Sequence, residues 1–310
     1  MRKIFGIASL ALMLLTGVAC NNEGVPDGPK GKYPILFRCS DDTRAVATVD
    51  SMKDDENGFD VYAYIKGSTG ATDSFEKNVK WDGSAWSYTG LEYWIPGATY
   101  WFKAVYPKGI ANVDNDNTTD EIPTQAVTIT NFDITSQKDI LVAETARAGL
   151  KATPEDQAPT TGSVVSLQFK HLLANVTIKI KAEINVTIND VTLKFVPVKG
   201  SYTNGIWSCP TQGNIEKTNL NKTLNSSNNE FQDVTDGGFL VFPSSVDDAH
   251  LFIKTSNKSY DIKLPATPSE WVAGNKYSYT LTIKQNDILF DEPTVEEWDE
   301  ENATGSVVIK

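Results

Sequence analysis

The sequence predicts an all-β protein with two β-sandwich domains in tandem, and three observations lead to this prediction. Short runs of alternating apolar and polar residues recur along the 310 residues, with the period of two that marks strands with one buried face. Gly, Pro, Asn and Asp separate these runs at short intervals, as turn residues do. Beyond residue 20, no run keeps an apolar helical period over the length of an ordinary helix. The chain is long enough to bury two cores.

The composition indicates a globular body and argues against nucleic acid as a partner. Hydrophobic residues make up 40% of the chain, so a packed core is expected instead of disorder. The 40 acidic and 28 basic residues give a formal net charge of -12, and no basic patch stands out in the sequence. We expect no cofactor, because no glycine-rich phosphate loop joins a strand to a helix.

Residues 1–19 have the pattern of a signal peptide. Arg2 and Lys3 precede an apolar run that is too short to cross a bilayer. Small residues then lead directly into Cys20, and this ending resembles the lipobox of bacterial lipoprotein signals. The resemblance implies cleavage before Cys20 and lipidation of its thiol, so that the lipid alone would anchor the chain to a membrane. An ordinary secretory signal followed by a chance cysteine is the alternative.

A tether rich in Gly, Pro and Asn, residues 20–32, leads into the first predicted sandwich, residues 33–160. Asp82-Gly83 and Pro96-Gly97 predict tight turns between runs rich in aromatic residues. The polar segment 111–123 is expected to be a loop. Another polar, proline-containing segment ends this domain near residue 160. Strands are expected at residues 33–37, 59–64, 126–132 and 139–143 and on both sides of the two turns.

The second predicted sandwich, residues 161–310, opens with two strands and a tight corner between them at His171. Val165, Leu167 and Phe169 alternate with polar or small residues, and the alternation resumes after His171 with its phase shifted. Asn204-Gly205 predicts a hairpin further along the chain. The Asn-rich segment 209–236 has no hydrophobic period and is expected to be a mobile surface excursion.

Apart from Cys20, the chain has two cysteines, Cys39 and Cys209. A disulfide is compatible with export, but the two residues fall in different predicted domains, so we favour free, buried thiols and leave a bridge open. No cysteine or histidine spacing is typical of a metal site. The acidic segment from Asp114 to Glu121 is expected to be a solvated loop, with loose calcium binding as the alternative.

No group of residues in the sequence predicts catalysis, and we expect a protein that is not an enzyme. His171 and His250 stand outside any catalytic motif, and a structural role is expected for His171. An enzyme that acts on surface polysaccharide is the minor alternative. Six aromatic residues are expected in the core or in cross-strand pairs, with a glycan-stacking platform as the alternative: Trp81, Trp86, Tyr93, Trp94, Tyr100 and Trp101.

Several segments, in order along the chain, resemble the fimbrillins, the type V pilins of Gram-negative surface fimbriae. Each motif is weak alone, but the ordered set covers nearly the whole chain after the signal peptide. The segments are the lipobox at Cys20, TRA at 43–45, FDVYAY from Phe59, YWIPGATYWFKAVYP at 93–107, KDILVA from Lys138, LQFKHLLANVTIKI at 167–180, GGFLVFPSS at 237–245, WVAGNKYSYTLTIKQNDILF at 271–290 and VEEW at 295–298.

The resemblance implies two transthyretin-like β-sandwiches and an outer-membrane lipoprotein of the cell surface. It also implies that an Arg-specific protease cuts after the first strand, here after Arg44 or, as the second candidate, after Arg38. The cut would release the strand at residues 33–37 and open a groove. A strand from the C-terminal region of another fimbrial subunit would fill this groove and restore the buried core and the strand ladder.

The donor strand implied for this chain is its terminal segment: Gly305, Ser306, Val307, Val308, Ile309 and Lys310. The simpler interpretations are an ordinary exposed arginine at Arg44 and an edge strand at the C-terminus. Function is then predicted as a structural, adhesive fimbrial subunit, whose position as shaft, tip or anchor stays open. The alternative is a monomeric outer-membrane surface lipoprotein that binds a glycan or a host protein.

Overall fold

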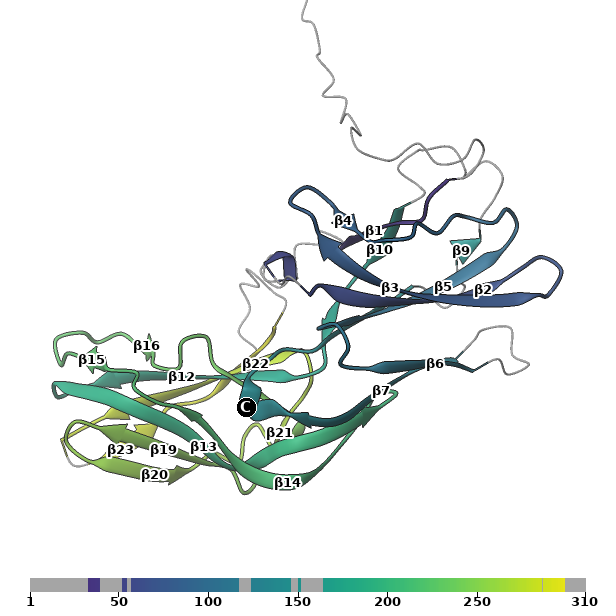
Figure 1. Cartoon of the computed structure of the whole chain (residues 1–310). Helices are drawn as coiled ribbons and strands as arrows, with labels where there is room; N and C mark the ends of the chain where they lie inside the picture. The colour runs from purple at the N-terminus through teal and green to yellow at the C-terminus, as the bar shows by residue number, and fades with distance from the viewer. Residues whose placement is uncertain are drawn as a thin grey trace, which may run out of the picture.

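The computed structural model describes the chain over residues 33–39, 52–54, 57–116, 124–145, 150–151, 164–285 and 287–298. Its named elements are the strands β1 to β24 and one 3-10 helix, η1 (Ile134–Ser136), which confirms the predicted all-β class. The strands form two lobes, of which the upper one in Figure 1 carries β1 to β5 and the lower one β12 to β23. In the part of the chain that is described, no helix has the length and apolar content to cross a bilayer.

The upper lobe has one large sheet and one small one. The large sheet has the order β11-β8-β5-β2-β3-β4, with β9 also paired to β5. The small sheet pairs β1 with β10. The bounds are β1 Leu36–Cys39, β2 Phe59–Lys66, β3 Thr72–Trp81, β4 Trp86–Ser87, β5 Thr99–Tyr106, β8 Leu141–Glu144, β9 Leu150–Lys151, β10 Val164–Leu167 and β11 Lys170–His171.

The lower lobe is built from two larger sheets and one short pair. One sheet has the order β16-β12-β22-β23 with β17 and β24, the other β20-β19-β13-β7-β6 with β14 and β15, and β18 pairs with β21. The bounds are β6 Asn112–Asp116, β7 Thr124–Asp133, β12 Ala174–Ala182, β13 Val186–Thr203, β14 Ile206–Lys217, β15 Lys222–Leu224, β16 Gln232–Asp233, β17 Phe239–Val241, β18 Ser244–Ser245, β19 His250–Thr255, β20 Ser259–Lys263, β21 Glu270–Trp271, β22 Asn275–Ile283, β23 Ile288–Phe290 and β24 Thr294–Glu297.

Each lobe has its own hydrophobic cluster, as two predicted domains require. The first core gathers the inward side chains of β1, β2, β5 and β10, and the second core those of β7, β12, β13, β19 and β22. The predicted alternation in β2 is present, because Phe59, Val61 and Ala63 are fully buried in the first core. Tyr62, on the opposite face of β2, belongs to the second core.

Strand pairing crosses residue 160 in both directions. The hairpin of β6 and β7 precedes that position and yet pairs with β13 of the lower lobe. Conversely, β10 follows it and pairs with β1 of the upper lobe. The Tyr62 hydroxyl donates to the backbone carbonyl of Ala111 at 3.1 Å, which joins β2 to the segment before β6. The division into domains at residue 160, and their transthyretin-like character, stay predictions.

The predicted turns are present where glycine accepts a left-handed backbone. Thr203 pairs with Ile206 across Asn204-Gly205, and both turn residues have positive φ, as a tight hairpin requires. Asp82-Gly83 lies in the connection between β3 and β4, where the Asp82 carboxylate accepts from the backbone amides of residues 84 and 85.

Three local expectations are corrected. The segment predicted as a loop at 111–123 contains β6, whose backbone pairs with β7 despite its polar sequence. The expected surface excursion at 209–236 contains most of β14 and all of β15 and β16, because the long β13 supplies a pairing edge for β14 and β15. The corner at His171 is itself a short strand, β11, which pairs with β8.

The aromatic residues near the two turns serve mainly as core. Tyr100 is fully buried, and Trp86 and Trp101 are nearly so. Trp94 packs edge-on against Tyr100 with 4.7 Å between ring centroids. A glycan platform that used all six of these rings is therefore excluded, and the core alternative is confirmed for most of them.

Candidate functional site: the groove that holds the N-terminal strand

The strand β1 lies in a groove of the upper lobe beside β10, and the residues just before it, 33–35, lie beside the segment at residues 92–94. In Figure 1 it lies beside β10 and β4 at the top of the molecule. Its whole length pairs in parallel with β10, with Phe37 opposite Val165 and Cys39 opposite Leu167. The two strands are far apart in sequence, so the groove exists only in the folded chain.

Three hydrogen bonds hold the residues just before β1, at positions 33 and 35. The Ile35 amide donates to the Glu92 carbonyl at 2.8 Å, and the Trp94 amide donates to the Tyr33 carbonyl at 3.0 Å. The Tyr88 hydroxyl donates to the Ile35 carbonyl at 2.6 Å. Burial raises the pKa of Tyr88 to about 12, so this donor stays protonated at neutral pH.

Alternate side chains of the segment fill the first core. Ile35, Phe37 and Cys39 are 0%, 4% and 6% exposed, whereas Arg38 between them is exposed. The Phe37 ring lies 5.6 Å from the rings of both Tyr88 and Phe102, centroid to centroid. Burial thus alternates with a period of two, and the strand lies at residues 36–39, where the sequence predicted one at 33–37.

The groove consists of strand backbone and apolar side chains that β1 covers. Without β1, the β10 backbone would lose its parallel partner, and Val165, Leu167 and Phe102 would line an open apolar slot. Unpaired strand backbone and exposed core side chains are both unfavourable, so β1 stabilises this side of the first core.

The structure locates only part of the predicted processing and assembly residues. Arg38 is at the third position of β1, opposite Ser166, with its side chain in solvent. Cys20, Arg44 and the donor candidates Gly305–Lys310 lie outside the described residues. The acidic segment at 114–121 is described only through residue 116, and the described residues contain no group of three or more His, Cys, Asp or Glu side chains placed to hold a metal ion.

Sequence reasoning missed one wall of the groove. It placed β10 in the second domain, because the polar segment before it was taken as a domain boundary. The repeated buried pattern at Val165 and Leu167, in a strand too short for a domain core of its own, was the signal that β10 could pair elsewhere.

The described C-terminal end of the chain is fixed at His171. β24 pairs with β22, and the Trp298 amide donates to the Gly274 carbonyl at 2.8 Å. The Trp298 ring stacks on His171 with 3.7 Å between centroids, and His171 Nδ1 lies 2.6 Å from an Asp139 carboxylate oxygen. His171, four residues after β10, thus links the groove to the last described residue, in the structural role that was predicted.

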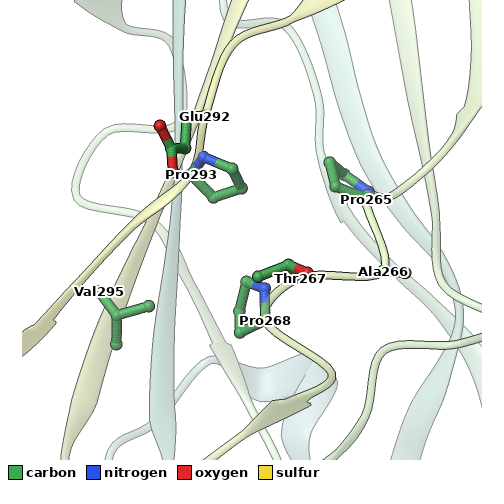
Figure 2. A pocket seen from close by; sticks show the side chains of 7 residues that line it. All are labelled: Pro265, Ala266, Thr267, Pro268, Glu292, Pro293 and Val295. Atoms are coloured by element: carbon green, nitrogen blue, oxygen red, sulfur yellow. The ribbon is translucent and has the colours of Figure 1, made fainter. Parts of the chain in front are cut away.

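Two surface hollows offer no catalytic arrangement. The hollow in Figure 2 has a volume of about 280 Å³ and lies between the connection before β21 and the connection before β24. Its polar lining groups are one hydroxyl and one exposed carboxylate, and three of its lining residues are prolines. Its lining is Pro265, Ala266, Thr267, Pro268, Glu292, Pro293 and Val295. A second hollow, of about 360 Å³, is lined by Leu172, Tyr202, Gly205, Ile206, Trp207, Pro243, Val272 and Ala273. Neither lining contains the pair of carboxylates that glycoside hydrolysis requires.

The fold and the groove together define a class: an all-β protein of two lobes with a short N-terminal strand inserted into the first core. A family model described as fimbrillin-like matches residues 43–298, which is more than half of the chain. The chain therefore belongs to the fimbrillin-like family. No curated protein matches the chain.

Solved structures agree on the fold. A fimbrial protein from Bacteroides vulgatus is similar with a TM-score of 0.60 and 16% sequence identity, over 86% of this chain and 99% of that one. A candidate cell adhesion protein from Bacteroides uniformis has a TM-score of 0.52 and 18% identity, over 86% and 99%. A third protein of that description, from Bacteroides ovatus, has a TM-score of 0.52 and 14% identity, over 87% and 98%. At such identities the likeness establishes the fold alone.

Proposed function

We propose that this chain is a structural subunit of a cell-surface fimbria and that it assembles by strand exchange and contributes to adhesion. Membership of the fimbrillin-like family supports the fimbrial role. The observation that carries the exchange mechanism is β1 itself, a short strand that is paired and buried as a core strand is, but lies near the start of the described chain.

Proteolysis after Arg44 would separate all of β1 from the rest of the chain. A cut after Arg38 would instead have to reach the middle of a paired strand, since Arg38 lies opposite Ser166 in the ladder with β10. Proteases bind substrates in extended and accessible form, so the backbone at Arg38 is protected while β1 stays in the groove. We therefore favour Arg44 as the processing site.

The proposed donor is the segment Gly305–Lys310 of another subunit. Val307 and Ile309 are two residues apart, as are Ile35 and Phe37, so both pairs would point to one side of an extended strand. The donor would thus offer two apolar side chains to the slot between β10 and residues 92–94. Twelve residues, 299–310, follow Trp298 in the sequence, which is enough chain to carry such a strand away from its own lobe.

The remaining parts of the proposal concern location and partners. Export as a lipoprotein with lipid on Cys20 would place the chain at the outer membrane before assembly, and the partners would be other fimbrial subunits. We propose no catalytic activity and no cofactor. Nucleic acid is not expected as a partner, because the formal net charge is -12.

Deletion of Gly305–Lys310 tests the donor role. The full chain and the truncated chain are expressed separately, each at the surface of the same type of cell. The detergent-resistant multimers that each chain forms are then compared. The truncated chain should stay monomeric, while an Arg38→Ala chain should still form multimers. Multimers of the truncated chain would show that the donor assignment is wrong.

The monomeric surface lipoprotein stays as the second candidate, because the uncut chain fills its own groove with β1. This candidate predicts that chains recovered from the surface still carry β1 and the lipid at Cys20. A population of monomers that keeps β1 under conditions that produce fimbriae would favour it over the assembly role.

A further inference from the structure

Phe195 is an outlier in the backbone of the lower lobe. It lies within the 18-residue strand β13, where its φ is 59°, in the left-handed region that bulky side chains avoid. Among the described residues, the other non-glycine positions with positive φ are Asn, Gln or Asp. A bulky aromatic residue in this conformation persists only where the surrounding structure fixes it, and such residues are concentrated at functional sites.

A β-bulge turns Phe195 outward. Val191 and Leu193 are buried, and after the bulge the burial resumes in the opposite phase at Val196 and Val198. The register with β14 shifts between residues 194 and 196. The extra residue leaves the Phe195 side chain 54% exposed. Bulges of this kind re-aim a side chain beside binding sites.

The exposed ring is surrounded by a fixed set of polar groups from β13, β19 and β20. The His250 ring stands at 90° to the Phe195 ring, with 5.4 Å between centroids. One Asp261 carboxylate oxygen lies 2.7 Å from Lys194 Nζ, and the other lies 3.0 Å from His250 Nδ1. Lys194 Nζ lies 5.8 Å from the Phe195 ring centroid and 5.1 Å from the Phe252 ring centroid. Hydrogen bonds from Lys194 and then from His250 lower the pKa of Asp261, so the carboxylate stays charged at neutral pH.

We propose that this surface binds a neutral sugar, with the Phe195 ring stacked on the apolar face of a pyranose and with Asp261 and His250 bound to its hydroxyl groups. We call it the Phe195 surface: Lys194, Phe195, His250, Phe252 and Asp261. A pyranose has one face of C–H bonds and a rim of hydroxyl groups, which matches an exposed aromatic ring beside a fixed carboxylate and an imidazole.

The charge pattern favours a neutral ligand over an anionic one. Lys194 is already paired with Asp261, so the surface presents no uncompensated positive charge from that residue. The formal net charge of -12 would also repel a polyanion at long range. A protein partner fits less well, because the core of a protein interface is apolar, and here a single exposed aromatic ring is surrounded by charged side chains.

The site does not depend on the proposed assembly. β19 and β20 lie in the lower lobe, away from β1 and β10 at the top of Figure 1, so an exchange of β1 would leave the surface open. A shallow site with one stacking ring is expected to bind a monosaccharide with a Kd on the order of 1 mM. Repetition along a fibre would raise the avidity, and only this last step rests on the proposed function.

Saturation-transfer NMR on the full, purified chain tests the site. The probes are methyl glycosides of glucose, galactose, mannose and N-acetylglucosamine, with N-acetylneuraminic acid as the anionic comparison. We expect saturable transfer from aromatic protein protons to the C–H groups of at least one neutral glycoside. Phe195→Asn should weaken binding by at least about tenfold. The variant chain should still fold, since Asn occupies several of the other left-handed positions in this chain.

Phe231→Asn is the matched control. Phe231 is also exposed, at 36%, with Lys181 Nζ 4.5 Å from its ring centroid, but it lies on the other large sheet of the lobe, beside β16. This variant should bind as the parent does, and Asp261→Asn should weaken binding while Phe195 keeps its place. The proposal is overturned if no neutral glycoside binds, if binding survives Phe195→Asn, if only the anionic sugar binds, or if Phe231→Asn has the same effect as Phe195→Asn.

Discussion

The strands β1 and β12 are both buried, but they are held very differently. β12 pairs over eight residues with β22 on one side and with β17 and β16 on the other. β1 pairs over four residues with β10 alone, and three further hydrogen bonds hold the residues just before it. β12 is therefore paired along both edges inside its lobe, whereas β1 is held by fewer contacts, as its proposed replacement by another strand requires.

The largest expected effect breaks the attachment of β1. Phe37→Ala removes a ring packed against Tyr88 and Phe102 and should destabilise the seated strand by about 3–5 kcal/mol. Hydrogen exchange by mass spectrometry should accelerate in β10 and stay unchanged in β12. Equal acceleration in both strands would mean that β1 is part of the general frame.

The matched substitution in β12 should act on the whole lobe. Ile178 is fully buried, and Ile178→Ala should lower the free energy of unfolding by about 2–5 kcal/mol. Chemical denaturation should show this loss, while exchange in β10 under native conditions should stay as in the parent. If Ile178→Ala loosened β10 first, the contrast between the two strands would be wrong.

A smaller effect concerns the hydroxyl that holds β1. Tyr88→Phe removes the hydrogen bond to the Ile35 carbonyl and should cost about 1 kcal/mol at neutral pH. The folded pKa of Tyr88 is raised to about 12 from its usual value near 10, so its contribution is complete below pH 10 and is lost as the pH rises through about 12. Protection of β10 amides, taken relative to the intrinsic exchange rate at each pH, should therefore fall between these pH values in the parent. The same fall of protection in a Tyr88→Phe chain would assign it to another group.

The smallest expected effect concerns the bulge at Phe195. Phe195→Gly releases a left-handed strain of about 1–2 kcal/mol and loses some packing, so the net change in unfolding free energy should be a gain of no more than about 1 kcal/mol. Phe252, on β19 and without a positive φ, also lies near Lys194 and is the control, and Phe252→Gly should destabilise the chain. Thermal unfolding of the two variants measures the difference. A clear loss at Phe195 would mean that packing, and not backbone strain, dominates there.

The sequence was sufficient for the parts of the fold that depend on local pattern. The alternation in β2 and the Asn204-Gly205 hairpin follow from side-chain period and turn chemistry, and both are present. It was not sufficient for β6 and β14, whose residues are largely polar and which become strands through pairing with β7 and β13. Which distant segment a strand will pair with cannot be predicted from the sequence of either segment alone.

Neither the groove nor the Phe195 surface could be predicted from the sequence, and the two reasons are related. The parallel pairing of β1 with β10 crosses the predicted domain boundary, and no local signal reports it. Phe195 reads as a core residue, because it continues the alternation of Val191 and Leu193. Only the bulge, a property of the pairing with β14, reverses its direction. The aromatic residues that stood out by their density lie mostly in the core instead.

The most direct test of the account is the N-terminus of the chain in assembled fimbriae. Multimers are isolated from the cell surface, and the first residue of the subunit is determined by mass spectrometry. If assembly replaces β1, the chains in the multimers begin at Ala45 and lack β1. Multimers whose chains still begin at a lipidated Cys20 and retain residues 33–39 would contradict the replacement of β1 by a strand from another subunit.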